Sequence, residues 1–348
     1  MRLSKTLVIF LAIFGVAAQA YEARPHFLSS MSGFMAMGLR QSCYAIDISS
    51  NTLPCNPAFI AKEKSRRFTA SMYLGNNVSY LKEATDLSRG QANEDTIKKL
   101  FQRHEDDELQ TQIELGHIQE KFGWSVTPIQ VNYSTTFRNQ VLPQISLYAS
   151  LEEAAKVQFG SYLGEDWSFG IQLRYTQRRF VTSQFYLTDA LVPGGSDLFE
   201  PRKQSAFFVE PAVLYTPDDN YLNPEFTVFV ANAGYIDKAY SELRINPEYH
   251  FTVSINPEMV YGRYSLGLDM NFNKDIQHNS GPLTLGGFYE YGILRLFGSV
   301  ARDENGIGFG VFNTWWNLGI VNKNEVVDNS FGNWISLQKT YLFLGIEI

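Results

Sequence analysis

Histidines are the side chains best suited to acid–base chemistry and metal binding near neutral pH, and this chain has five. They are His26, His104, His117, His250 and His278. None has a cysteine or a second histidine at the spacing of metal ligands. A lone strand histidine such as His117 could meet a carboxylate, but it is more often an interfacial or lumen residue. There is no Gly-x-Ser-x-Gly elbow and no glycine-rich phosphate loop. We therefore predict no enzyme, no catalytic residues, no metal and no cofactor.

The first twenty residues are typical of a secretory signal peptide. Arg2 and Lys5 supply a positive start, residues 7–16 are apolar, and Ala18 and Ala20 form a small-residue cleavage site. The apolar stretch is shorter than the ~20 residues that a spanning helix needs, and nothing later resembles one. If the mature chain is a membrane protein, only a closed barrel can satisfy its backbone polar groups in lipid.

Composition narrows the class of protein further. The formal net charge is −7 and becomes more negative once the signal peptide is removed, which argues against nucleic acid as a partner. Aromatic residues make up 14% of the chain and there are 26 glycines, as expected for interfacial aromatic girdles and close-packed barrel strands. The alternative reading is a soluble secreted β-protein.

Two nearby cysteines in an exported protein more often pair than stay free, and the chain has only Cys43 and Cys55. Closing so short a loop stabilises a segment by ~2–3 kcal/mol. A redox or metal role would instead call for Cys-x-x-Cys spacing or neighbouring histidines. We predict a structural disulfide.

Two segments, 167–175 and 264–272, alternate apolar and polar residues one for one. Successive strand side chains point to opposite faces, so each segment is a long strand with one apolar and one polar side. Such strands behind an export signal indicate an antiparallel transmembrane β-barrel in the bacterial outer membrane, with outer-membrane lipid around it.

Turn residues divide the chain from Arg66 onward into fourteen predicted strands. These are 66–76, 107–119, 123–136, 145–161, 166–183, 203–216, 224–236, 246–255, 259–273, 282–291, 293–301, 305–312, 314–320 and 336–348. Every second connection is short, as expected for periplasmic turns. The even strand count requires residues 305–320 to be split in two at Asn313.

The regions outside the strands also have distinct patterns. Residues 21–63 do not alternate, and we interpret them as a small N-terminal plug or hatch before the barrel of residues 64–348. In the longest connection, 77–106, the apolar spacing of residues 93–104 predicts a short amphipathic helix over the barrel mouth. The second long connection, 184–202, is predicted to be irregular.

The N-terminal motifs resemble those of a known family. Residues 32–38 (SGFMAMG), 45–50, Asn56-Pro57-Ala58 and Ala61 resemble the opening of the long-chain fatty-acid outer-membrane transporter superfamily, which includes type IX secretion shuttle barrels and plasmid-transfer-like outer-membrane proteins. Residues 251–269 also resemble a pattern near the C-terminus of its members. The resemblance implies a fourteen-stranded barrel with an N-terminal hatch.

Two functions are compatible with these patterns. The first is passive uptake of a hydrophobic or amphipathic small molecule, released when the plug around Asn56, Pro57 and Ala58 moves. The expected ligand path carries four apolar residues: Phe27, Phe34, Met35 and Met37. Methionine adapts to ligands of different shape. The alternative is a non-transporting barrel that anchors or docks a partner protein.

Seven polar residues fall on the polar phase of their strands and are expected to face the lumen. They are Glu114, Gln172, Arg174, Arg263, Asp269, Asn271 and Arg295. They either line a passage or form a mutually neutralising network that fills the barrel.

Overall fold

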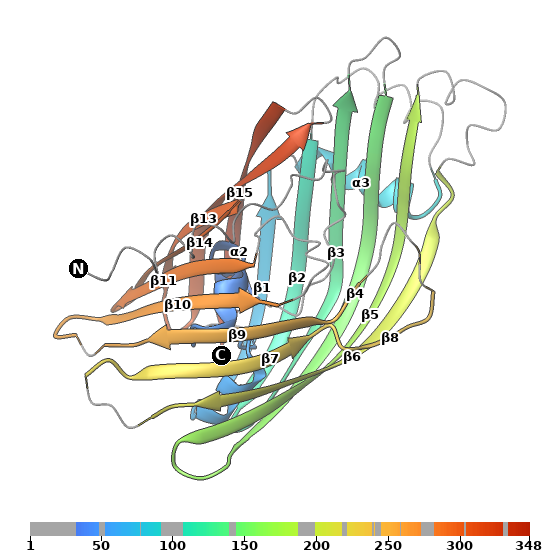
Figure 1. The fold of residues 1–348 in the computed structure, drawn as a ribbon. Helices are drawn as coiled ribbons and strands as arrows, with labels where there is room; N and C mark the ends of the chain where they lie inside the picture. Colours follow the sequence, from blue (N-terminus) through green and yellow to red (C-terminus); the bar gives the residue numbers. More distant parts are fainter. Residues whose placement is uncertain are drawn as a thin grey trace, which may run out of the picture.

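The computed structural model describes most of the chain, with gaps. The described ranges are 33–48, 53–76, 78–91, 107–138, 144–186, 199–217, 221–238, 240, 245–257, 259–272, 282–302, 304–329 and 333–348. Within them the fold is dominated by long antiparallel strands (Figure 1). No helix among these residues has the length and apolar character needed to cross a bilayer.

The strands form one closed antiparallel barrel. Their bounds are β1 Arg67–Gly75, β2 Asp107–Gln119, β3 Phe122–Arg138, β4 Gln144–Tyr162, β5 Trp167–Tyr186, β6 Arg202–Tyr215, β7 Pro224–Ala231, β8 Gly234–Ile236, β9 Glu248–Ile255, β10 Arg263–Asn271, β11 Leu283–Tyr291, β12 Leu294–Ala301, β13 Glu304–Phe312, β14 Trp316–Asn329 and β15 Asn333–Glu347. Apart from β8, sequential strands pair, with β7 next to β9, and the ring is closed by the pairs β1–β15 and β5–β6. Strands β7 and β8 both pair with β6 and are interrupted only at Asn232 and Ala233. The wall therefore has fourteen strands, as predicted.

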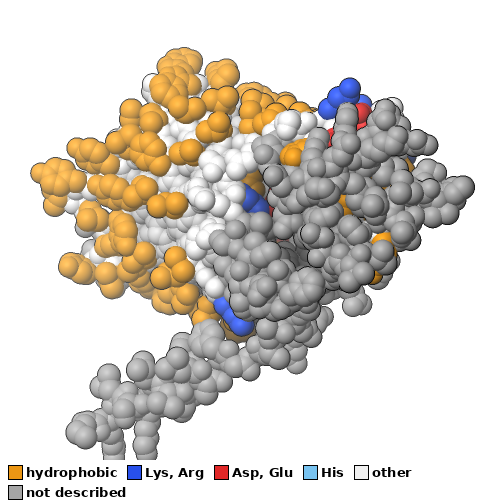
Figure 2. Space-filling model, turned by 90° about the horizontal axis from the view of Figure 1, so that it is seen from above, with side chains coloured by type: hydrophobic (Ala, Val, Ile, Leu, Met, Phe, Trp, Pro, Cys, Tyr) orange, Lys and Arg blue, Asp and Glu red, His pale blue; other side chains and the backbone are white. Residues whose placement is uncertain are grey.

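Side chains alternate between the lumen and the outer surface. On β5, Trp167 is 47% exposed whereas Gln172 is fully buried. On β15, Leu342 and Leu344 are exposed whereas Tyr341 and Phe343 are buried. Apolar side chains crowd the outer surface on the left of Figure 2. A closed barrel with an apolar outer wall is the architecture of bacterial outer-membrane proteins, and the predicted location is confirmed.

The predicted strand boundaries agree with the structure within a few residues, with one clear exception. The turn at Asn313 is confirmed, because Asn313 N–H donates to the carbonyl of Trp316. However, β14 runs to Asn329 rather than ending at residue 320. The apolar alternation stops near Val321, but the strand continues because its backbone still pairs with β15 as far as Asn333. Backbone pairing in β14 therefore extends beyond the residues that alternate between apolar outward and polar inward side chains.

The long first connection contains a helix that was not predicted, α3 (Leu81–Ser88), preceded by the short 3₁₀ turn η3 (Val78–Tyr80). It packs against the outer face of the wall. Leu109, Tyr133, Ala149 and Val181 are register neighbours on β2–β5, on the same outward phase as the exposed Ile113, yet all four are buried. Ala84 and Leu87 of α3 belong to the same apolar cluster.

Several predictions lie outside the described residues. They concern the signal peptide (1–20), Phe27, the amphipathic helix at 93–104 and most of the connection 184–202.

Candidate functional site: the plugged lumen

The N-terminal segment folds inside the barrel (Figure 1). We call its described residues, 33–48 and 53–62, the plug. It contains α2 (Phe34–Leu39) and two 3₁₀ helices, η1 (Arg40–Tyr44) and η2 (Pro57–Lys62). Most contacts of α2 and η1 are with β10–β14, and most of those of η2 are with β3–β6. In addition, α2 reaches β15, η1 reaches β7 and β9, and η2 reaches β7.

The Asn-Pro-Ala motif is the start of η2. The Asn56 side-chain oxygen accepts the N–H of Ala58 at 3.0 Å, and Pro57 occupies the first helical position. A short polar side chain at the cap and a proline just inside it favour a helix start at this point. The Asn56 amide nitrogen also donates to the carbonyl of Tyr44 at 3.0 Å and to Thr227 Oγ1 at 3.2 Å. One residue thus joins both parts of the plug and the wall.

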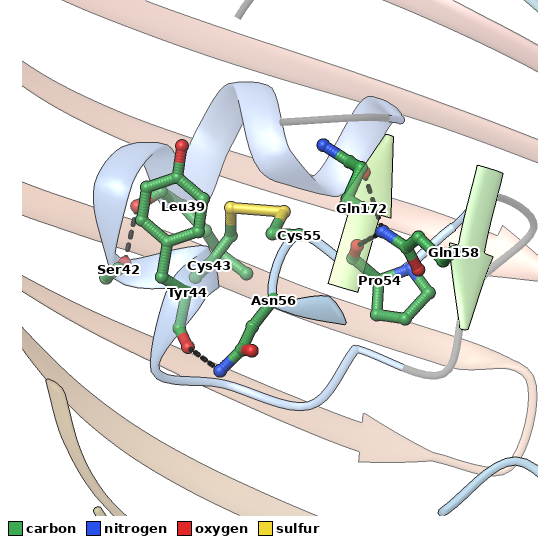
Figure 3. The surroundings of a disulfide bond; sticks show 9 residues. All are labelled: Leu39, Ser42, Cys43, Tyr44, Pro54, Cys55, Asn56, Gln158 and Gln172. Atoms are coloured by element: carbon green, nitrogen blue, oxygen red, sulfur yellow. Dashed lines mark hydrogen bonds between the residues drawn. A yellow bond between two sulfur atoms is a disulfide. The ribbon is translucent and has the colours of Figure 1, made fainter. Parts of the chain in front are cut away.

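A disulfide between Cys43 and Cys55 lies beside this contact (Figure 3). Both cysteines are buried. On the η2 side, the Gln158 amide donates to the carbonyl of Pro54 at 2.8 Å and to Gln172 Oε1 at 2.7 Å. The wall therefore holds the plug backbone through side-chain amides.

Phe34 anchors α2 on an aromatic surface of the wall. Its ring stacks on Phe343, with centroids 4.5 Å apart, and meets Phe297 edge-on at 5.5 Å. Met35 is buried in the same cluster, and Met37 packs at its edge. Phe34, Met35 and Met37, named as path residues from the sequence, therefore lie together inside the barrel. Pro57 and Ala58 are buried on the opposite wall.

Ion pairs hold both parts of the plug to the wall. Lys62 lies 2.6 Å from Glu225. Arg40 pairs with Glu304, which also lies 2.6 Å from Lys323. Each pair joins a plug cation to an inward carboxylate, so the plug and the wall are complementary in charge.

Arg263 contacts the plug rather than lining open lumen. It donates to the carbonyl of Asp47 at 2.9 Å and lies 3.6 Å from the Asp47 carboxylate. Burial raises the pKa of Asp47 above its ordinary value, and the charge of Arg263 only partly opposes this effect. Docking of the plug therefore costs the charged form of Asp47 more than the neutral form.

A buried polar network lies around Arg174. Its guanidinium is 2.7 Å from Glu210 Oε1 and lies over the Phe208 ring, 4.2 Å from the centroid. Gln172 also donates to Glu210. The backbone N–H of Asn232, in the interruption between β7 and β8, donates to Glu210 at 2.9 Å.

The network continues along the same wall to β9 and β10. The Asn232 amide donates to Glu248 at 2.9 Å, and Asn271 donates to the same carboxylate at 3.2 Å. Next to it, His250 Nδ1 lies 3.0 Å from both oxygens of Asp269. Gln172, Arg174, Asp269 and Asn271 thus belong to one connected set.

The other two predicted lumen residues lie elsewhere on the inner wall. Arg295 is 3.5 Å from Glu290, and its guanidinium lies over the Phe312 ring at 4.3 Å. Glu114 is buried, and Gln112 approaches its carboxylate at 3.5 Å.

Sequence reasoning missed four members of the network: Glu210, Asn232, Glu248 and His250. Glu210 sits opposite Gln172, one strand away on the same inward phase, so its strand phase was an available signal. Asn232 had no such signal in the sequence, because its inward position depends on the interruption between β7 and β8. Among the described residues, no group of three or more His, Cys, Asp or Glu is arranged to hold a metal ion.

Comparison with known proteins gives no family for this chain. No family model matches it, and no curated protein matches it. Among solved structures, the CymD monoaromatic hydrocarbon channel aligns with a TM-score of 0.47 at 8% identity, covering 90% of this chain and 95% of that one. The Pseudomonas putida toluene transporter TodX gives 0.47 at 9%, covering 95% and 98%, and the Ralstonia pickettii toluene transporter TbuX gives 0.47 at 8%, covering 89% and 98%. With TM-scores below 0.5, these likenesses carry no conclusion about a ligand.

Proposed function

We propose that this protein is an outer-membrane channel for passive entry of small hydrophobic or amphipathic molecules, closed by residues 21–63 and opened when they move. The supporting observation is an aromatic surface inside the barrel. It comprises Phe288, Phe297, Phe312 and Phe343, all buried on inward positions. Binding sites for small molecules are mostly apolar and carry a few polar groups, whereas a water-filled pore needs no aromatic lining.

The ligand path of this proposal runs along the plug. Phe34, Met35 and Met37 cover the aromatic surface, and a ligand that replaces Phe34 meets the rings of Phe297 and Phe343. Asn56, Pro57 and Ala58 form the opposite boundary of the path. Phe27 belongs to the proposal but lies outside the described residues.

Uptake across an outer membrane tests this function. Hydrophobic probes cross simple phospholipid bilayers unaided, so the assay uses cells with an intact outer membrane and compares expression of the protein with empty vector. A labelled fatty acid and a labelled monoaromatic compound are supplied from outside. We expect faster uptake of at least one of them, reduced by Phe297→Ala but not by Leu285→Ala on the outer face. Equal uptake with and without the protein would remove this function.

The second candidate is a non-transporting barrel that docks a partner protein. The connected network from Gln172 to Asp269 favours it, because fully buried ion pairs fill space that a passage would need. This function predicts no uptake of either probe. It also predicts recovery of a stoichiometric protein after cross-linking in the outer membrane.

A further inference from the structure

The plug bridges two separated parts of the wall. Helix α2 and η1 pack mainly on β10–β14, and η2 packs mainly on β3–β6. In the ring, β1 and β2 separate these strand groups on one side, beyond the contact of Phe34 with β15. On the other side the two halves of the plug meet at β7, where Tyr44 packs on Phe229 and Lys62 pairs with Glu225. The plug therefore has an α2 half (residues 33–44) and an η2 half (residues 53–62) that rest mainly on different parts of the wall.

The disulfide is the covalent link between these halves. Cys43 lies in η1 and Cys55 just before η2, with a sequence separation of 12. The hydrogen bond from the Asn56 amide to the carbonyl of Tyr44 crosses the same junction at 3.0 Å. Figure 3 shows both links side by side. Without the disulfide, this junction would depend on weak contacts and on the intervening chain.

The two halves differ in how they are fixed to the barrel. The η2 half continues directly into β1, which begins at Arg67. The α2 half has only non-covalent wall contacts, such as the Phe34 stack and the 2.7 Å hydrogen bond from Ser299 Oγ to the carbonyl of Gly38. The disulfide removes 12 residues from the path between Cys43 and Arg67. At about 3.4 Å per extended residue, that shortens the reach of the α2 half by roughly 40 Å.

We propose that the Cys43–Cys55 disulfide is the lock that keeps the α2 half in the lumen and the barrel sealed. When the lock is absent, the α2 half leaves its wall while the η2 half stays. When it is present, the plug can move only as one piece. Unlocking is a two-electron reduction: a dithiol gives up two electrons and two protons and becomes a disulfide, the Cys43–Cys55 bond breaks, and two thiols form. This lock rests on the proposed channel function, but its test uses ions and needs no ligand.

Ion conductance in planar bilayers tests the lock. Wild-type protein is compared with the double variant Cys43→Ser and Cys55→Ser. A shift in gel mobility that appears only after heating shows that each protein was folded beforehand. We expect wild type to be nearly silent and the double variant to conduct at least several-fold more. Dithiothreitol should raise wild-type conductance to that level and leave the double variant unchanged.

Two controls separate a lock from general loosening. Ser299→Ala removes the hydrogen bond to the carbonyl of Gly38 and so weakens the α2 seat but keeps the disulfide, and it should stay nearly as silent as wild type. Trypsin should cut the folded double variant after Arg40 but not after Lys62, because only the α2 half leaves. Equal conductance of wild type and the double variant, or a Ser299→Ala conductance as high as that of the double variant, would overturn the proposal. A sealed wild type that takes up no hydrophobic probe would instead reject the channel function and leave the lock intact.

Discussion

The carbonyl oxygen of Pro57 lies 2.1 Å from the point where a Cβ on Gly170 would stand. The plug backbone rests directly on the wall there, because a glycine on β5 provides the space. Gly160, the cross-strand neighbour of Gly170 on β4, also lies close to the plug, with Ile60 2.6 Å from its Cβ position. The seat of η2 is therefore made by two adjacent glycines.

Gly170→Ala should displace η2. The new methyl group would overlap the Pro57 backbone, which cannot rotate away, and overpacking of this kind costs about 1–3 kcal/mol. We expect faster hydrogen–deuterium exchange in residues 57–62 with an intact barrel. Gly287→Ala is the matched control, because its nearest atom beyond the adjoining residues would be at an ordinary 3.5 Å. Unchanged exchange in Gly170→Ala would show that η2 does not rest on this glycine.

Phe34→Ala should loosen α2. Removing a buried phenylalanine typically costs about 3–5 kcal/mol, and this ring packs on both Phe343 and Phe297. Exchange should therefore rise in residues 34–39 and not in residues 57–62. Phe34→Leu keeps most of the apolar volume and should have a smaller effect. Equal exchange in the alanine variant and wild type would mean that the ring does not anchor the helix.

Glu210→Gln should destabilise the barrel. It leaves the Arg174 charge buried without its carboxylate, and breaking a buried pair in this way costs about 3–5 kcal/mol. The measurement is the temperature at which the folded barrel is lost in detergent. Replacing both partners, with Arg174→Met and Glu210→Leu, should recover much of the loss. Arg179 lies on the same strand as Arg174 but is exposed, so Arg179→Gln should change this temperature little. A Glu210→Gln barrel as stable as wild type would argue against the network.

Asp47 should make plug stability depend on pH. Its pKa is raised in the folded protein, so its contribution is fully present below its unfolded value of 3.8 and is lost as pH rises through the folded pKa. Asp47→Asn mimics the neutral form and removes this titration. The variant should match wild type in acid and become relatively more stable at higher pH, as measured by melting temperature. A difference that shrinks with rising pH would contradict the assignment.

The amino-acid sequence alone determined most of the wall. A strand repeats every two residues, so the pattern 167–175 assigns Trp167 to lipid and Arg174 to the lumen without knowledge of any partner. The requirement for an even strand count placed the turn at Asn313, and residues 21–63 were set apart because they lack the alternation. The cysteine pair could also be proposed from composition and export.

Tertiary structure decided which groups meet. Arg174 finds Glu210 through the register of β5 against β6, and Asn232 turns inward only at the interruption between β7 and β8. Helix α3 packs outside the wall because outward positions on β2–β5 remain apolar beyond the exposed belt. Register, interruptions in strands and docking bring together residues far apart in the chain. The two-residue period of a strand does not specify these pairings.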